Sequence, residues 1–421
     1  MVSSDYPIER IREAFPALQR IEKDYFAGYF DGPGGTQVAK SVIDVMSNYM
    51  KNGVANLGGE SPTSNETATL VAQARETVAT LLGTNQENIV FGANMTTLAF
   101  RIARALRKTW GNDKGNIVVT EMDHHANIDP WITAVEDSQI DIHTIRVNEE
   151  SKTLEMDALE AIITDETKLV AIGLASNAIG TINEVVPIIR RAKEVGALVA
   201  LDGVHAVPHF TVNFNDLGAD FLFCSAYKFF GPHVGIVAIK QTAFEQLTPF
   251  KLVPAPNEAP EILETGTINF EGLVGVTEAI QFIASIGDGN LLREKLNSAY
   301  KKITEYENHL ANRLRNGLAN IDHVTLYQAN EQVFKTPTVA FKVTGMDAKV
   351  VCHYLTTHYS LHLEYGDFYA KILVERLEAN TQGGLIRAGI SPYNTEEEID
   401  RLIEALQQLR QYIAIEQTEQ K

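Results

Sequence analysis

Cysteine is almost absent from this chain of 421 residues, in which only Cys224 and Cys352 occur. Two cysteines are too few for a disulfide framework or a four-cysteine metal site, and their scarcity is compatible with a reducing cytosol. The chain also lacks an apolar run of about 18 residues, the length that crosses a bilayer, and the first 16 residues contain no apolar signal core. We therefore expect a cytoplasmic protein with no membrane partner.

Positive charge is scarce as well, because 36 Lys and Arg residues stand against 54 Asp and Glu and give a formal net charge of −18. No basic cluster interrupts this balance, so the surface would repel the phosphates of nucleic acids and of anionic lipids. We expect no nucleic-acid partner. With 45% hydrophobic and 21% charged residues, the composition is that of a globular chain and not of a disordered or fibrous one.

Seven short apolar runs alternate with helical patterns between about Asn88 and Lys240. This alternation is typical of βαβ units around a largely parallel sheet that is buried on both faces. The pattern predicts one large α/β domain. The runs are 88–91, 116–120, 140–147, 168–174, 197–201, 221–224 and 235–239.

A second, smaller α+β domain is predicted after Ile239. A Pro-rich loop at 253–260 and a turn at Gly266–Thr267 lead into a helix-rich stretch from Leu273 to about Ile321, where 291–319 is expected to form one long amphipathic helix. We place the large domain at 28–270 and the small domain at 271–421 together with 1–27. Its remaining elements are expected to be strands at 324–327, 337–343, 361–364 and 385–389 and a helix at 348–358.

The last helix is expected to run to about Ile415. Thr395 and Glu398 have the spacing of a capping box, in which each residue bonds the backbone N–H of the other, so they mark its start.

Polar side chains follow five of the seven apolar runs. In an open α/β sheet, ligands bind beyond the carboxyl ends of the strands, where helix N-termini point their amides outward. Five strand ends therefore deliver an anion-binding turn, an imidazole, an amide, a carboxylate and a lysine to one edge. These groups are Asn94-Met95-Thr96, Asp123-His124, Ser176-Asn177, Asp202 with His205, and Ser225-Ala226-Tyr227-Lys228.

Lys228 is the most unusual of these groups, because burial of an ammonium is costly and lowers its pKa toward that of a usable nucleophile. Taken singly, each group is most simply a cap, a turn residue or a solvated charge. Taken together, they match what pyridoxal phosphate requires: a lysine for the Schiff base, a carboxylate for the ring nitrogen, a flat ring to stack and amides for the phosphate.

With these residues in view, the chain resembles the class V aminotransferase family of fold-type I pyridoxal-phosphate enzymes, in the branch that holds cysteine desulfurases, selenocysteine lyases and isopenicillin-N-epimerase-like proteins. The resemblance extends from Asp31 to Leu409 and is most specific at 121–128 and 202–232. It implies a large domain with a mainly parallel seven-stranded sheet plus a smaller C-terminal α+β domain, and a homodimer. The turn 31–36 is typical of a desulfurase-like subgroup; read without the resemblance, it is an ordinary loop.

The resemblance also implies a role for each site residue. Lys228 would form the Schiff base and move the substrate Cα proton, while Asp202 would pair with the ring nitrogen. His124 would stack on the ring, and Asn177 would bond the ring hydroxyl. Arg387 would hold the substrate α-carboxylate, a task suited to a planar bidentate donor; without the resemblance it is a surface arginine at a strand edge. The expected phosphate contacts are Met95, Thr96, Ser225, Tyr227 and, from a neighbouring subunit, Thr267.

Three positions depart from the desulfurase pattern. Tyr369 stands where desulfurases carry the nucleophilic cysteine, Glu364 where they carry a further arginine, and His205 where a glutamine lies beside the Schiff base. Cys224 in a core strand and Cys352 on an apolar helix face are most simply packing residues. Persulfide chemistry is therefore not expected.

We predict an enzyme that uses pyridoxal phosphate to act on an amino acid, with a C–S β-lyase reaction on cysteine, cystine or a related S-conjugate as the first choice. An epimerase with His205 or Tyr369 as its second base and a transaminase are the rivals, and a protein that binds cofactor without a reaction stays open. A metal-dependent hydrolase is the alternative of another class. Its ligands would come from Asp123, His124, His125, Asp202, His205 and His209.

Overall fold

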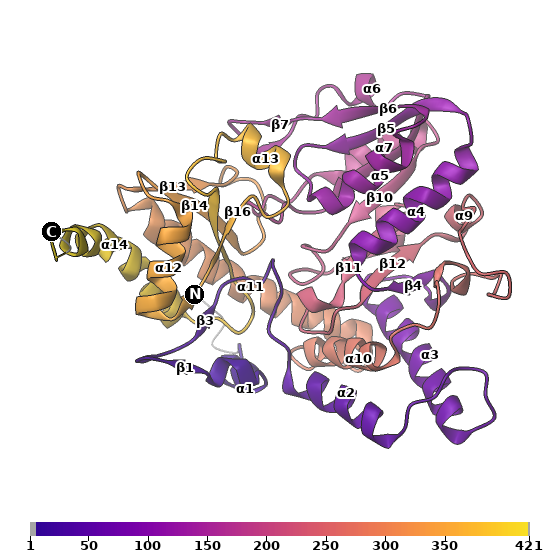
Figure 1. The fold of residues 1–421 in the computed structure, drawn as a ribbon, viewed down its shortest axis with the longest axis horizontal. Coiled ribbons are helices and arrows are strands. Elements are labelled where there is room, and N and C mark those ends of the chain that lie inside the picture. The colour runs from indigo at the N-terminus through magenta and orange to yellow at the C-terminus, as the bar shows by residue number, and fades with distance from the viewer. Residues whose placement is uncertain (1–5, 420–421) are drawn as a thin grey trace.

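Two β-sheets organise residues 6–419, the part of the chain that the computed structural model describes. In Figure 1 the larger sheet lies on the right and the smaller on the left, with the long helix α11 (Leu292–Ala319) between them. The sequence predicted this helix at nearly the same bounds. None of the helices in residues 6–419 combines the length and the apolar character that a membrane span requires.

The larger sheet contains the seven strands that the sequence predicted, in the order β4-β12-β11-β10-β9-β5-β6. β12 runs antiparallel to both of its neighbours, and the other pairs are parallel. The mainly parallel α/β sheet is thereby confirmed. Its strands are β4 (Ile89–Gly92), β5 (Lys114–Thr120), β6 (Gln139–Ile145), β9 (Thr167–Gly173), β10 (Leu198–Asp202), β11 (Phe221–Ser225) and β12 (Gly235–Ile239).

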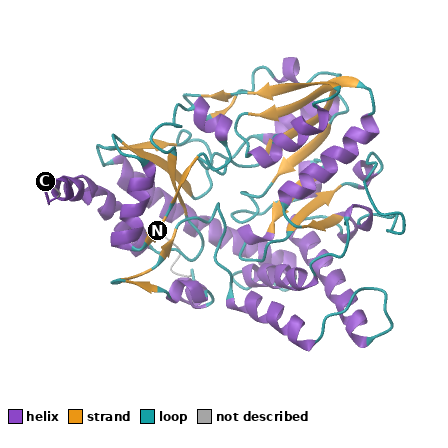
Figure 2. Ribbon diagram, viewed as in Figure 1, coloured by secondary structure: helices purple, strands orange, loops and turns teal. Residues whose placement is uncertain are grey.

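Both faces of this sheet are buried, as Figure 2 shows by the helices around its strands. Successive side chains of a strand point to opposite faces. Phe221 and Phe223 of β11 therefore pack with α4 (Met95–Trp110) and α5 (Asp129–Val135). Leu222 and Cys224 pack on the other face, whose core is built with α3 (Pro62–Leu82), α7 (Val185–Glu194) and α10 (Phe270–Ala284).

Helices α2 (Lys40–Asn52) and α3, which the sequence analysis did not assign, pack against α10. Local signals define the ends of α3. The Ser61 side chain accepts a hydrogen bond from the Ser64 N–H, a proline follows it, and Gly83 ends the helix with a φ of 66°. The shorter elements are α1 (Ile8–Glu13), β1 (Ile21–Glu22), β2 (Tyr25–Phe26), β7 (Val147–Asn148), β8 (Thr153–Leu154), α6 (Leu159–Ile162), α8 (Phe214–Leu217), α9 (Gln241–Phe244) and α13 (Lys371–Arg376).

The smaller sheet is antiparallel, in the order β13-β14-β17-β16, and α11, α12 (Ala348–Tyr359) and α14 (Glu396–Glu419) pack with it. Its position in the chain agrees with the predicted α+β region. The boundary at residue 270 stays a prediction. Its strands are β13 (Val324–Tyr327), β14 (Thr338–Val343), β16 (Glu364–Gly366) and β17 (Leu385–Gly389).

Two predicted strands are wrong in extent. In the run 140–147, β6 ends at Ile145, and the last residue, Val147, begins β7, which pairs with β8. The run 361–364 divides between two sheets, because β15 (Leu361–His362) pairs in parallel with β3 (Gly28–Tyr29) and β16 joins the antiparallel sheet. In both cases the apolar pattern continues while the chain changes its pairing partner.

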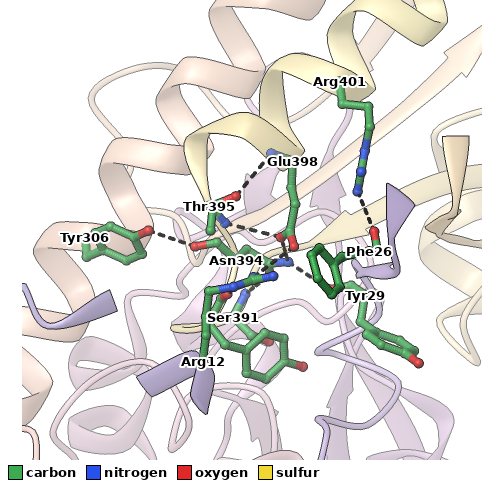
Figure 3. A network of polar contacts seen from close by, with 10 residues as sticks. Arg12, Phe26, Tyr29, Tyr306, Ser391, Asn394, Thr395, Glu398 and Arg401 are labelled. Carbon is green, nitrogen blue, oxygen red and sulfur yellow. Dashed lines mark hydrogen bonds and ion pairs between the residues drawn. The ribbon is translucent and has the colours of Figure 1, made fainter. Parts of the chain in front are cut away.

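The start of α14 is held by the predicted capping box (Figure 3). The Thr395 N–H donates to the Glu398 carboxylate and the Glu398 N–H donates to the Thr395 hydroxyl, both at 3.2 Å. Glu398 also pairs with Arg12 at 2.8 Å, which ties the N-terminal segment to this helix. The helix continues to Glu419, beyond the predicted end near Ile415, and residues 1–5 and 420–421 lie outside the described part of the chain.

Candidate active site

The carboxyl ends of β4, β5, β9, β10 and β11 open into one cavity of about 510 Å³ between the two sheets. Parallel strands that share a direction end at the same edge, so residues from distant parts of the sequence meet there. Ten of the predicted site residues line this cavity: Met95, Thr96, His124, Asn177, Asp202, His205, Ser225, Tyr227, Lys228 and Arg387.

Lys228 lies in a single 3-10 turn directly after β11, where its side chain reaches the turn 31–36. Its Nζ donates to the carbonyl oxygens of Pro33 and Gly34, the latter at 2.9 Å. Burial and the charge of Arg387 lower the pKa of the amine from 10.5 to about 8. At neutral pH a usable fraction of this amine is therefore unprotonated.

Two carboxylates with raised pKa values line the cavity together with Lys228. Asp202 ends β10, accepts the Val204 N–H at 2.9 Å, and has a pKa raised by burial to about 6. Asp123 accepts the Gly173 N–H at 2.8 Å and the Asn127 amide at 3.0 Å, and burial raises its pKa to about 7. Because these bonds join the loop after β5 to β9, Asp123 fixes the loop that carries His124.

His124 is neutral in this environment, because burial and the charge of Lys228 lower its pKa to about 4. Its Nδ1 accepts the Ala126 N–H at 2.9 Å, so the proton of the neutral ring is on Nε2. The ring stacks on Tyr369 with centroids 5.4 Å apart. A flat, uncharged ring thus forms one wall of the cavity.

His205 is held by two threonines of the smaller half of the chain. Its Nε2 lies 2.9 Å from the Thr336 hydroxyl and 3.0 Å from the Thr338 hydroxyl. Burial, followed by the charges of His209, Arg387 and Lys228, lowers its pKa well below 6.5. The ring is neutral, and its Nε2 is already bonded.

The predicted anion-binding turn is the start of α4. The Met95 N–H donates to the Ser225 hydroxyl at 3.2 Å, and Asn94 caps the helix by accepting the Thr97 N–H. The N-terminus of a 16-residue helix attracts an anion through its free amides and its dipole. Gly235 allows this close approach, because a Cβ there would lie 2.2 Å from the Asn94 carbonyl carbon.

Arg387 is buried, with 3% of its surface exposed, so its interpretation as a surface arginine is wrong. Its guanidinium pairs with Asp31 at 2.6 Å, donates to the Asn177 carbonyl oxygen at 3.0 Å, and lies 4.0 Å above the Phe368 ring. The turn 31–36 is not an ordinary loop either. It carries Asp31 to Arg387 and the two carbonyl oxygens to Lys228.

Thr267 is the one predicted cofactor contact that lies away from the cavity of its own chain. It borders a separate depression near Arg101 and His233.

Phe368, Thr336 and Thr338 touch site residues, and the sequence analysis missed them. No local pattern marks them, because each is a loop or strand residue whose partner lies more than a hundred positions away.

Neither cysteine lines the cavity. Cys224 is fully buried in β11 and Cys352 is 5% exposed on α12, as predicted, and burial raises the pKa of both thiols.

Among residues 6–419, no group of three or more His, Cys, Asp or Glu side chains is arranged to hold a metal ion. His209 instead pairs with Glu307 at 2.9 Å, so the metal-dependent alternative receives no support from the geometry.

A family model for class V aminotransferases matches residues 28–402. The chain belongs to the aminotransferase class-V family. The family and the fold class that the sequence predicted are thereby confirmed, and the chain is an enzyme of a pyridoxal-phosphate-dependent family.

The relatives of this class V chain include an aminotransferase-like protein and cysteine desulfurases. It is 31% identical to the aminotransferase-like protein FGM3 of Gibberella zeae, over 97% of this chain and 99% of that protein. It is 29% identical to a cysteine desulfurase of Enterobacter sp., over 96% of this chain and 98% of that protein. The apo structure of a cysteine desulfurase from Thermococcus onnurineus superposes with a TM-score of 0.85 at 26% identity, covering 97% of this chain and 99% of that one.

Proposed function

We propose that this enzyme binds pyridoxal phosphate in the cavity and cleaves the C–S bond of cysteine, cystine or a related S-conjugate. One observation carries the proposal. A lysine amine of lowered pKa shares the cavity with a buried carboxylate and an arginine, while neither cysteine of the chain reaches it. When bound, pyridoxal phosphate supplies an electron sink for the bond that breaks at the substrate Cα.

The residues of the cavity fit this cofactor. Lys228 would hold its aldehyde carbon, Asp202 its ring nitrogen and His124 its ring face, while the start of α4 and Ser225 would take its phosphate. A further observation supports the fit, because the Asn177 Oδ1 is buried and has no hydrogen-bond partner within residues 6–419. Buried polar atoms are normally bonded, so an orphaned one facing a cavity indicates a missing partner.

Lys228 and Arg387 would divide the work on the substrate. With a pKa of about 8, the Lys228 Nζ can take the Cα proton and return it. Arg387 would orient the α-carboxylate, and Asn177 and Phe368 hold its guanidinium in place. Since Asp31 already pairs with Arg387, the substrate carboxylate would share this guanidinium with Asp31.

The fate of sulfur follows from the missing thiolate. Tyr369, which lines the cavity, has a phenol that cannot accept sulfur, and both thiols are buried elsewhere. The Cα–H and Cβ–S bonds would break, the proton would go to Lys228, and sulfur would leave with the bonding electron pair. Water then converts the released enamine to pyruvate and ammonia, so no oxidant or reductant is needed.

Product analysis tests this reaction. The holoenzyme with L-cysteine should release sulfide, pyruvate and ammonia in equal amounts, and Lys228→Ala should abolish all three. Alanine together with a protein-bound persulfide would overturn the proposal and assign a role to Cys224 or Cys352. Cα hydrogen exchange in deuterated water without sulfide release would favour the epimerase, and conversion of a keto acid to an amino acid would favour the aminotransferase.

We also propose a homodimer that places Thr267 beside the cofactor phosphate of the partner. Four apolar side chains support an interface, because they are 46% to 57% exposed on and after α2: Ile43, Met50, Val54 and Leu57. Exposed apolar side chains that gather in one region indicate a contact surface. Light scattering should give twice the chain mass of 46.5 kDa. A fully active monomer would refute the dimer.

A cytoplasmic location is proposed as well, supported by the two free thiols.

A further inference from the structure

The wall of the cavity formed by the smaller sheet is acidic and aromatic. Residues 364–369 follow one another along it, as the strand β16 and the loop after it. They contribute two carboxylates, Glu364 and Asp367, and three aromatic rings, Tyr365, Phe368 and Tyr369. An ammonium or guanidinium group is stabilised by carboxylates and by the faces of aromatic rings.

The positive charge nearest to this wall is already neutralised. Arg387 is the cross-strand partner of Glu364 in the β16 and β17 register, but its ion pair is with Asp31 at 2.6 Å. Within residues 6–419 the Glu364 carboxylate makes no hydrogen bond or ion pair. The wall therefore carries more negative than positive charge.

A second observation indicates that a ligand is missing at this end of the cavity. The Arg387 side chain is 4% exposed, and its Nε is buried without a hydrogen-bond partner in the described part of the chain. This N–H is a donor, so the ligand group that it lacks is an acceptor, such as the α-carboxylate of a bound amino acid. At Glu364, burial and the charge of Asp31 raise the pKa although the charges of Arg387 and His362 lower it, so the positive charge around this carboxylate does not offset its burial. A cation bound beside Glu364 would remove this mismatch.

We propose that Glu364 binds a cationic group on the side chain of the substrate, so that the enzyme selects amino acids ending in an ammonium or guanidinium. This inference rests on the proposed function, because it assumes that the α-carboxylate lies at Arg387 and the reacting carbon at Lys228. Glu364 and Arg387 are cross-strand neighbours in β16 and β17, and both line the cavity. A single amino acid can therefore reach both with its two ends.

Three amino acids that share a six-carbon chain differ mainly in the charge at its end: L-lysine, L-norleucine and L-2-aminoadipate. Their dissociation constants for the holoenzyme are measured by calorimetry, which needs no turnover. Lysine should bind at least about tenfold more tightly than norleucine, the difference expected for one hydrogen bond to a charged group. Aminoadipate should bind most weakly.

Variants of Glu364 assign the preference to this residue. E364Q should bind lysine and norleucine about equally, and E364R should prefer aminoadipate. E375Q is the matched control, since Glu375 is an exposed glutamate of α13 whose contact is the surface ion pair with Lys371, and it should leave the order unchanged. Thermal unfolding of each variant checks that it is folded. Norleucine binding as tightly as lysine, or a lysine preference that survives in E364Q and E364R, would overturn the inference.

A parallel series tests the reaction separately. S-(2-aminoethyl)-L-cysteine, S-propyl-L-cysteine and S-carboxymethyl-L-cysteine repeat the three charges with a sulfur that can leave. The cationic compound should give the highest kcat/KM for pyruvate release, and E364Q should lower that value about tenfold. If the binding order holds and no compound yields pyruvate, the lyase proposal fails while the role of Glu364 stands. If pyruvate is released without a charge preference, the role of Glu364 fails and the lyase stands.

Discussion

The pH dependence of Lys228 is the sharpest test of the site. Burial and Arg387 lower the pKa of the amine to about 8, against an ordinary value of 10.5. The unprotonated, reactive fraction is then about 9% at pH 7, about 50% at pH 8 and about 91% at pH 9. The rate at which the apoenzyme attaches pyridoxal phosphate should rise about fivefold from pH 7 to 8 and less than twofold from pH 8 to 9. An ordinary amine would gain about tenfold in each step.

Two substitutions should move this midpoint in opposite directions. Arg387→Gln removes a positive charge that lowers the pKa of Lys228, so the midpoint should move to higher pH. Asp202→Asn removes a negative charge that raises it, so the midpoint should move to lower pH. Each shift should be about one pH unit, the size expected for one nearby charge. Because the readout is a midpoint, a lower cofactor affinity in either variant does not imitate the effect.

Rapid mixing followed by near-visible absorbance measures the attachment rate. Free Nα-acetyl-lysine, treated in the same way, reports the pH dependence that belongs to the cofactor itself. Borohydride reduction and peptide mapping then identify the attached lysine. A tenfold rise per unit continuing to pH 10, or a reduced pyridoxyl group on a lysine other than Lys228, would refute the reasoning.

Two further predictions concern stability and are measured by urea unfolding. Gly235→Ala places a Cβ 2.2 Å from a backbone carbon at the start of α4, so it should lower the free energy of unfolding by about 1–3 kcal/mol and weaken cofactor binding. Gly35→Ala is the control and should be tolerated, because the nearest atom to its Cβ would be 3.4 Å away. An equal loss of stability in the two variants would contradict the steric argument. Arg75→Met leaves the Glu264 carboxylate, 5% exposed, without its partner and should cost about 3–5 kcal/mol. Lys40→Met breaks an exposed pair and should change stability by less than about 0.5 kcal/mol; a similar loss in both variants would show that burial is not the cause.

The sequence by itself determined the large sheet and the edge at which the site lies. Continuous apolar, β-branched runs and capping residues are local properties, so runs such as 235–239 and the capping box at Thr395 are recognisable without a partner. The order of strand ends along the chain then placed Asp202, His124 and Lys228 on one edge, since parallel strands share their direction.

Only the tertiary structure decided how these groups are paired. Arg387 meets Asp31 across 356 positions of sequence, His205 meets Thr336 across 131, and Phe368 lies beneath the Arg387 guanidinium. These contacts exist because the smaller sheet packs over the carboxyl edge of the larger one, and no periodicity records that packing. The same closure buries Lys228 and so lowers the pKa of its amine, because desolvation depends on every side chain around it and not on its neighbours in sequence.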